Sequence, residues 1–369
     1  MPGEERDEEM ISEEREQTSF KKFKSVGRKP LSLSQESLIR TRYLDPEQRF
    51  PLVMEPQVEG LNLVAWAREA RALIEEQLLK HGGILFRGFN VDSVSGFERF
   101  ARAISPELLD YRERAAPRIE VGNSIFTSTE YPADQQIPLH HEMSYSHNWP
   151  MKIWFFCLKP AEAGGATPIV SDRLIFDRIH PRVKGRFMDK KVMYVRNYGG
   201  GLDLSWENVF QTTDKSVVEE YCRKSLTEFE WREGNRLRTR QVRQAVATHP
   251  VTGDTVWFNH AHMFHVSNLE PSLRASLLAE FGEDDLPRNA YYGDGTPFEE
   301  TVLEEIRETY QQAAVIFPWQ KDDILMLDNI LASHGRQSYQ GDRKILVAMA
   351  ELFTNQPIEV SKSLPNLIV

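Results

Sequence analysis

Apolar positions recur along this chain at two spacings, and each spacing predicts a kind of element. Between Leu61 and His81 they recur every three or four residues and stop before Gly82-Gly83, which predicts a helix with a defined end. The same spacing predicts helices at Lys215–Leu226, Ser272–Phe281 and Phe298–Ala314. Short apolar runs predict strands at Ile84–Phe86, Lys152–Leu158, Thr167–Val170, Ala245–His249, Thr255–Asn259, Ile324–Leu327 and Ile345–Met349.

Turn and cap signals lie between these elements. Pro250–Asp254 predicts a hairpin turn between two strands. Thr296-Pro297-Phe298-Glu299 predicts a capping box, with proline at the first helical position. Strands separated by helical and irregular insertions do not form a regular βαβ repeat. A mainly β fold with helical insertions, an antiparallel double sheet or jelly roll, fits the pattern better, although periodicity alone does not decide it.

Length, charge and composition narrow the class of protein. The chain has 369 residues, 40% of them hydrophobic, and a net charge of −10, which disfavours nucleic acid and anionic membranes as partners. Residues 1–19 are acidic and poor in apolar side chains, so we expect a disordered tail followed by a single domain over residues 20–369. Two cysteines, no signal peptide and no membrane-spanning run predict a cytoplasmic protein without disulfides.

The candidate chemistry begins at His140-His141-Glu142. Side chains two apart on a strand share a face, so His140 and Glu142 can approach one ion while His141 points the other way. A further histidine, His334, comes much later in the chain. Two imidazoles and one carboxylate leave three octahedral positions open, as in non-haem iron(II) oxygenases. A lone His-x-Glu triplet also arises by chance on polar surfaces, so that alternative stays open on the triplet alone.

A second histidine group, His260-Ala261-His262 with His265, competes as a metal site. It offers no carboxylate at ligand spacing, so we interpret these side chains as lining the same cavity or satisfying backbone groups. His249, at a predicted strand end, is interpreted as structural.

Arg343 opens the apolar run at Ile345–Met349 and therefore needs an anionic partner. That partner is either a protein carboxylate or a diacid cosubstrate held by a bidentate arginine–carboxylate pair. Thr167 follows Gly164-Gly165 at the start of a predicted strand. Its hydroxyl would donate to the same carboxylate, or it is present simply because threonine favours strands.

Taken together, these residues resemble the taurine dioxygenase and clavaminate-synthase-like superfamily of Fe(II)- and 2-oxoglutarate-dependent oxygenases, over about residues 51–353. The motifs that carry the resemblance are Phe86-Arg87-Gly88-Phe89, His140-x-Glu142, Gly164-Gly165-x-Thr167, His249-Pro250-x-Thr252-Gly253 and Asp328-Asn329…His334-Gly335-Arg336…Gly341-x-Arg343. Further blocks, Tyr111–Arg114, Tyr131–Asp134, Ser144-Tyr145 and Tyr292–Gly295, are similar to the branch with the amino-acid hydroxylase of syringomycin biosynthesis.

The resemblance implies a double-stranded β-helix, the clavaminate-synthase-like jelly roll, with Fe(II) as metal and 2-oxoglutarate and O2 as cosubstrates. His140, Glu142 and His334 would be the iron ligands. Arg343 would pair with the distal carboxylate of 2-oxoglutarate, with Thr167 beside it. Halogenating relatives lack the carboxylate ligand, so Glu142 favours hydroxylation over halogenation.

The expected reaction is hydroxylation of an unactivated C–H bond, with release of succinate and CO2, in specialised metabolism. The expected substrate is a small molecule, an amino acid or an amino-acid-like unit, either free or bound to a carrier protein. Candidate substrate contacts are Arg112, Arg114, Asn123, Tyr131, Trp149 and Arg336, although each arginine is at least as well explained by a salt bridge. The rival hypothesis is a non-catalytic cupin-like protein that binds metal or 2-oxoglutarate. The acidic charge disfavours a nucleic-acid demethylase, and a homo-oligomer stays open.

Overall fold

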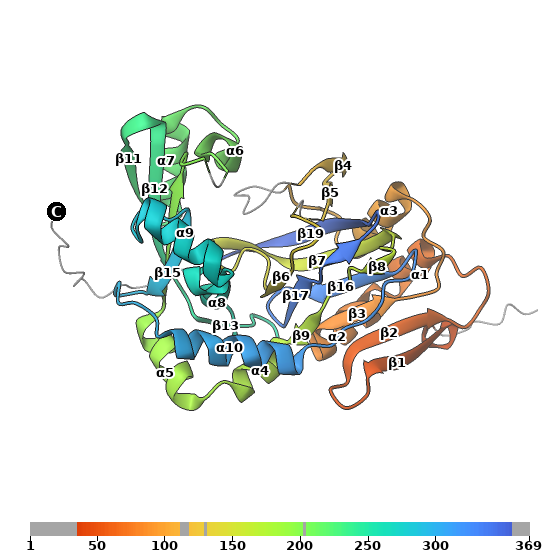
Figure 1. The fold of residues 1–369 in the computed structure, drawn as a ribbon. Helices are drawn as coiled ribbons and strands as arrows, with labels where there is room; N and C mark the ends of the chain where they lie inside the picture. Colours follow the sequence, from red (N-terminus) through yellow and green to blue (C-terminus); the bar gives the residue numbers. More distant parts are fainter. Residues whose placement is uncertain (1–34, 111–117, 129–130, 202–203, 356–369) are drawn as a thin grey trace, which may run out of the picture. The chain divides into compact units, whose positions relative to one another are not determined.

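The computed structural model describes residues 35–110, 118–128, 131–201 and 204–355. The expected acidic tail at residues 1–19 lies outside the described residues, as do the candidate substrate contacts Arg112 and Arg114. The chain divides into two units, Met1–Ser34 and Gln35–Val369, and the architecture below is that of the second unit. It mixes strands and helices, with several sheets (Figure 1).

The largest sheet has eight strands, and the strands predicted from apolar runs form its centre. Its order is β1 (Ile39–Asp45), β2 (Phe50–Pro56), β3 (Gly83–Phe86), β16 (Ile324–Asp328), β7 (Asn148–Lys159), β19 (Lys344–Thr354), β5 (Ile125–Thr127) and β4 (Glu120–Gly122). Only the β2–β3 pair is parallel among these neighbours. Near-continuous burial of β3, β16 and β7 agrees with their unbroken apolar runs.

A three-stranded sheet carries the candidate chemistry. Its order is β6 (Ile137–His140), β17 (Ala332–Arg336) and β9 (Ile169–Ser171), all antiparallel. The remaining sheets are β11 (Glu228–Arg232), β12 (Arg236–Arg243), β10 (Val192–Tyr198) and β15 (Arg288–Tyr292) in that order, then β13 (Val246–Thr248) with β14 (Thr255–Trp257), and β18 (Tyr339–Gln340) with β8 (Ala163–Gly164). The predicted hairpin is confirmed by the β13–β14 pairing.

Helices fill the connections between strands. They are α1 (Leu63–Glu69), α2 (Arg71–His81), α3 (Val94–Ile104), α4 (Asp172–Arg178), α5 (Pro181–Lys190), α6 (Trp206–Phe210), α7 (Lys215–Lys224), α8 (Ala261–Phe264), α9 (Pro271–Phe281) and α10 (Glu300–Ala313), with 3-10 turns η1 (Gln35–Leu38), η2 (Glu233–Asn235) and η3 (Val266–Asn268). No described helix is long and apolar enough to cross a membrane.

Two helix predictions need correction. The helix predicted over Leu61–His81 is two helices that meet at Ala70, and nothing in the sequence there explains the break. Its end is as predicted, because Gly82 adopts φ 76°, a left-handed conformation that favours glycine. The predicted capping box is wrong: α10 begins at Glu300, after Glu299 as N-cap. Thr296 instead donates from its amide and its hydroxyl to Asp294, at 3.0 and 2.6 Å.

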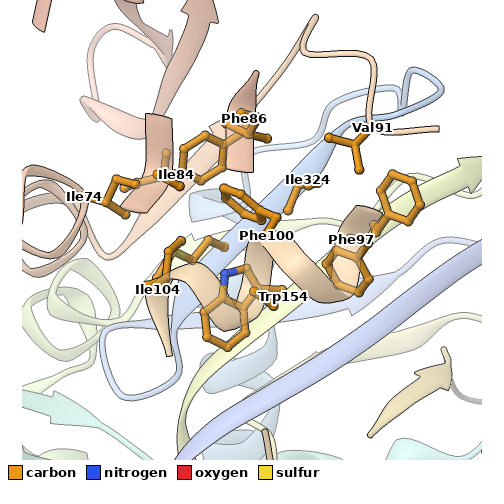
Figure 2. Close-up of a cluster of buried hydrophobic side chains, with 14 of the residues drawn as sticks. Ile74, Ile84, Phe86, Val91, Phe97, Phe100, Ile104, Trp154 and Ile324 are labelled. Carbon is orange, nitrogen blue, oxygen red and sulfur yellow. The ribbon is translucent and has the colours of Figure 1, made fainter. Parts of the chain in front are cut away.

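The core packed between α1–α3 and the large sheet is aliphatic and aromatic (Figure 2). Phe86 meets Phe100 edge to face, with ring centroids 5.0 Å apart, and Phe97 stacks on Phe156 at 5.1 Å. All four rings are at most 1% exposed. This packing fixes β3, β16 and β7 relative to the helices. Strand β16 leads into the segment that bears His334, and β7 follows the segment that bears His140 and Glu142.

Candidate metal centre

His140 and His334 face each other across two neighbouring strands. His140 ends β6 and pairs in register with His334 of β17, and their ring centroids are 4.6 Å apart. Glu142 lies two residues beyond His140, in the turn that follows β6. One ligand atom from each of the three side chains lies within 4.8 Å of the other two. In the described part of the chain this is the one group of three or more such side chains that could hold a metal.

Hydrogen bonds orient two of the three ligands from outside. Nδ1 of His140 lies 2.8 Å from the Pro138 carbonyl, so Nδ1 donates the proton and Nε2 is left for an ion. The buried side chain of Asn329 holds the Glu142 backbone from both sides. It accepts from the Glu142 amide at 2.8 Å and donates to the Glu142 carbonyl at 2.9 Å. Asn329 also donates to the Pro150 carbonyl at 2.8 Å, which ties the turn to β7.

Burial sets the protonation state of the histidines. It lowers the pKa of His140, although the neighbouring Glu142 acts in the opposite direction. It lowers the pKa of His334 far below the ordinary value of 6.5. Neutral imidazole is the form that binds a metal, so the folded protein presents both rings ready for coordination.

Arg118 is a member of the centre that sequence reasoning missed. Its guanidinium donates to Oε2 of Glu142 at 2.7 Å, and the two side chains are 4% and 5% exposed. A buried carboxylate needs such a charge partner, because desolvation is otherwise costly. No local pattern around Arg118 signals the pairing, since the two residues meet only in the folded chain.

The structure places the members of the second histidine group in different surroundings. His260 lies beside the centre, with its ring centroid 5.5 Å from that of His140 and its Nδ1 2.5 Å from the Ser144 hydroxyl. His262 instead contacts the Leu139 carbonyl through Nε2 at 2.9 Å, and His265 contacts Ser267. His262 therefore satisfies a backbone carbonyl, which is one of the two interpretations given for this group.

His249 has the structural environment expected of it. Its Nε2 lies 3.0 Å from Oδ2 of Asp328, and its Nδ1 accepts from the amides of Val251 and Thr252 in the hairpin turn. The imidazole therefore fastens the β13–β14 turn to the end of β16.

Arg343 and Thr167 come together, as the sequence interpretation expected. Nη2 of Arg343 lies 3.4 Å from the Thr167 hydroxyl, and Nε donates to the Gly165 carbonyl at 2.9 Å. Among the described residues no carboxylate pairs with Arg343. Burial lowers the pKa of its guanidinium to about 10, which leaves it charged at neutral pH. A half-buried cation without a protein carboxylate is suited to an anionic ligand.

The segment that holds Thr167 also runs along the strand that holds His334. Ile169 of β9 pairs with His334, and the Gly335 amide donates to the Pro168 carbonyl at 2.9 Å. The two histidines, the arginine and the threonine therefore belong to one neighbourhood, although they are spread over more than half of the chain.

The described candidate substrate contacts lie in different surroundings. Arg336 donates to the backbone carbonyls of Tyr131, Pro132 and Gln135 at 2.6–2.9 Å, so its guanidinium holds this loop in place. Tyr131 is 41% exposed beside it. Trp149 is 1% exposed and packs in the core against Phe258 and Phe353. Asn123 hydrogen bonds to Glu98 and Arg102 of α3.

The donor set fits a non-haem iron ion. Two neutral imidazole nitrogens and one carboxylate oxygen converge, and the His140 tautomer points its free nitrogen inward. Phe155 covers one side of His334, with ring centroids 4.7 Å apart, so the centre is partly shielded by apolar surface.

Comparisons with known proteins agree with this chemistry. The model of the family described as "Taurine catabolism dioxygenase TauD, TfdA family" matches residues 42–349. The dapdiamide synthesis protein DdaC of Enterobacter agglomerans is 40% identical over 278 residues, which cover 75% of this chain and 84% of DdaC. A clavaminate synthase-like protein of Arabidopsis thaliana is 28% identical over 321 residues, covering 82% of this chain and 94% of the relative.

Among solved structures, PvcB of Pseudomonas aeruginosa is similar in fold, with a TM-score of 0.53 at 16% identity over 88% of this chain and 94% of PvcB. A second PvcB structure has a TM-score of 0.51 at 16% identity, over 86% of this chain and 92% of PvcB. This PvcB is described as an Fe, alpha-ketoglutarate dependent oxygenase from an isonitrile synthetic pathway.

Proposed function

We propose a hydroxylase function from the premise that this chain belongs to the TauD/TfdA dioxygenase family, whose model matches residues 42–349. The family resemblance stated from the sequence is thereby confirmed. The chain is a 2-oxoglutarate-dependent dioxygenase that uses Fe(II), 2-oxoglutarate and O2. Its substrate, in our proposal, is an amino acid or amino-acid-like molecule, free or carrier-bound, that is hydroxylated at an unactivated C–H bond.

The fold is part of the proposal. We assign the eight-stranded sheet and the three-stranded β6-β17-β9 sheet to the two halves of a double-stranded β-helix, with helical insertions. The antiparallel pairing of β17 with both β6 and β9 supports this assignment. The fold similarity to PvcB supports it as well.

The observation that carries the proposal is that a candidate metal site at the β6–β17 pair lies beside the segment of a candidate anion site, because β9 pairs with β17. His140, Glu142 and His334 would bind the metal through atoms that lie within 4.8 Å of one another. Thr167, on the segment beside His334, and Arg343 would bind the cosubstrate. A facial set of three protein ligands leaves three positions for other molecules, and a half-buried arginine without a protein carboxylate suits a diacid.

Each residue then has a defined task. Bound iron would supply the chemistry by which O2 oxidises both substrates: one oxygen atom turns a C–H bond into C–OH, and the other enters succinate as 2-oxoglutarate loses CO2. Arg343 would hold the distal carboxylate, and the Thr167 hydroxyl, which already accepts from Trp319 at 3.0 Å, would donate its hydrogen to the same group. Glu142 would occupy the position that a halide needs, so we expect hydroxylation and no halogenation.

The similarity to a dapdiamide synthesis protein supports a substrate in a biosynthetic pathway. We expect such a substrate to contact the polar side chains of His260 and Tyr131. His260 lies beside His140, and Tyr131 is partly exposed at the loop that Arg336 clamps. Trp149 serves packing, because its ring lies between Phe258 and Phe353 in the core.

Anaerobic addition of Fe(II) and 2-oxoglutarate to the purified protein tests the site. We expect a weak visible charge-transfer band that is absent in His140→Ala. In Arg343→Ala the band should be much weaker and should recover at higher 2-oxoglutarate concentration, because only the distal anchor is lost. Lys344→Ala is the matched control, since it removes an exposed charge next to Arg343 and should leave the band unchanged.

Absence of the band in the unmodified protein at saturating iron would overturn the assignment of these residues. Succinate release across a panel of amino acids, free and carrier-linked, tests the substrate class. Product mass should increase by one oxygen atom and should show no halogen when chloride is present. If no amino acid raises succinate release above the substrate-free rate, the proposed substrate class is wrong.

A further inference from the structure

A buried carboxylate lies directly behind the metal centre. Asp172, the first residue of α4, has no exposed surface. Its Oδ2 accepts from the Ser333 hydroxyl at 2.6 Å and lies 3.0 Å from Nε2 of His141. Its Oδ1 accepts from the Tyr310 hydroxyl of α10 at 3.0 Å. All four side chains are at most 2% exposed, so the network exchanges no hydrogen bonds with bulk solvent.

The two partners of Oδ2 flank the proposed ligands. His141 stands between His140 and Glu142 in the chain, and Ser333 immediately precedes His334. On β17, neighbouring side chains point to opposite faces, so Ser333 turns away from the ion and toward Asp172. His141, just after β6, contacts the same carboxylate. One carboxylate oxygen therefore joins the two ligand-bearing segments.

The backbone reinforces this link. The Asp172 amide donates to the Leu331 carbonyl at 2.9 Å, just before β17 begins. The preceding strand β9 pairs with β17 through Ser171 and Ala332. Asp172 is thus held against β17 by its main chain, and its side chain reaches across to His141 behind β6.

His334 depends on this link more than His140 does. The ring of His140 is oriented by its own hydrogen bond to the Pro138 carbonyl. Nδ1 of His334 is buried and has no hydrogen-bond partner in the described part of the chain. The orientation of His334 therefore follows from its strand and from the neighbouring Ser333, whose hydroxyl is fastened to Asp172.

We propose that Asp172 is the positioning residue of the metal centre, the group that sets the spacing between His334 and the His140–Glu142 pair through Ser333 and His141. The proposal rests on the proposed ligand set, and Asp172 itself contacts neither metal nor substrate. A buried charge is stable only with its hydrogen bonds complete, so the three donors and the carboxylate hold one another in a single arrangement. Metal then binds to ligands that are already in place.

Metal affinity measured without substrate is the test. Co(II) or anaerobic Fe(II) is titrated into the metal-free protein, and the thermal midpoint of each variant is recorded. Asp172→Asn keeps the side-chain shape but loses an acceptor, and we expect the metal dissociation constant to rise about 10- to 100-fold. Ser333→Ala should cause a smaller rise in the same direction, and it keeps the test available if Asp172→Asn does not fold.

Two controls separate positioning from general stability. Asp323→Asn is a matched control, because Asp323 is also fully buried and hydrogen bonded, to Arg87 and Gln320, away from the ligand-bearing segments. It should lower the thermal midpoint without changing metal affinity. Tyr310→Phe is a graded control: it removes the donor to Oδ1 but leaves the contacts of Oδ2 with Ser333 and His141, so metal affinity should fall less than in Asp172→Asn.

The outcomes distinguish this inference from the ligand assignment. If His140→Ala binds metal as tightly as the unmodified protein, the ligand set itself is wrong. If His140→Ala loses metal while Asp172→Asn and Ser333→Ala keep normal affinity, the ligand set stands and the positioning role is refuted. Equal loss of affinity in Asp172→Asn and Asp323→Asn would also refute it, because the effect would then follow stability alone.

Discussion

The core beside α1–α3 and the layer behind the metal centre are buried to the same degree, yet different forces hold them. The first consists of rings and aliphatic chains such as Phe86, Phe97 and Phe100. The second contains polar side chains, Asp172 and Asn329 among them, that are fully buried and hydrogen bonded. Apolar packing is non-directional and tolerates shape-conserving change, whereas a buried hydrogen-bond network defines atomic positions. Stability should therefore come mainly from the first region, and ligand geometry from the second.

The largest expected effect on stability is in the apolar core. Phe100→Ala leaves a cavity against Phe86, and we expect the free energy of unfolding to fall by about 3–5 kcal/mol. Chemical denaturation of the metal-free protein measures this loss. The metal dissociation constant of the folded fraction should stay unchanged, because no proposed ligand is held by this ring. A parallel loss of metal affinity would contradict the division between the two regions.

Asn329→Ala should lower both the free energy of unfolding and the metal affinity. It leaves the Glu142 amide and two carbonyls without their partner, and we expect a loss of about 2–4 kcal/mol in unfolding free energy. Because the Glu142 backbone is then free to shift, metal affinity should fall too. Asn289→Ala is the control, since Asn289 is buried and hydrogen bonded to the Val266 amide, away from the ligands. Similar metal affinities in the two variants would show that Asn329 has no role at the ligand.

The smallest expected effect is the change of the free energy of unfolding with pH. Burial lowers the pKa of His262 to about 3 and that of His265 to about 4, below the ordinary value of 6.5. The unfolded chain therefore binds more protons than the folded one below pH 6.5, so the free energy of unfolding is highest above that pH and decreases as the pH falls toward 4. At pH 5.5 we expect a loss of about 1 kcal/mol for each histidine.

Urea unfolding of the metal-free protein at pH 7.5 and 5.5 measures this slope. His265→Asn should reduce this pH dependence of the unfolding free energy, because asparagine does not bind a proton in the unfolded chain. An unchanged slope in the variant would assign the pH dependence to other groups.

Local sequence patterns were sufficient for much of the fold. Unbroken apolar runs predicted β3, β7, β16 and β19, since burial on both faces of a strand leaves a readable signal. The sheet of β10, β11, β12 and β15 was not predicted. In strand β12, arginines alternate with other residues, and two of these arginines are buried. Both are hydrogen bonded: Arg243 donates to the Ser225 carbonyl, and Arg238 donates to Asp284. A hydropathy pattern does not predict such hydrogen-bond partners, so it does not predict that these arginines are buried.

By itself, the sequence determined the family. It also predicted His140, Glu142 and His334 as one ligand set, and it left two alternatives open for the anionic partner of Arg343. Only the tertiary structure decided that Arg118 neutralises Glu142, that Arg336 clamps a loop, and that His141 turns back to Asp172. The physical reason is the range of the interactions. Periodicity records how each residue relates to its own strand or helix, whereas these contacts join side chains that are distant in sequence and become neighbours only after the sheets have paired.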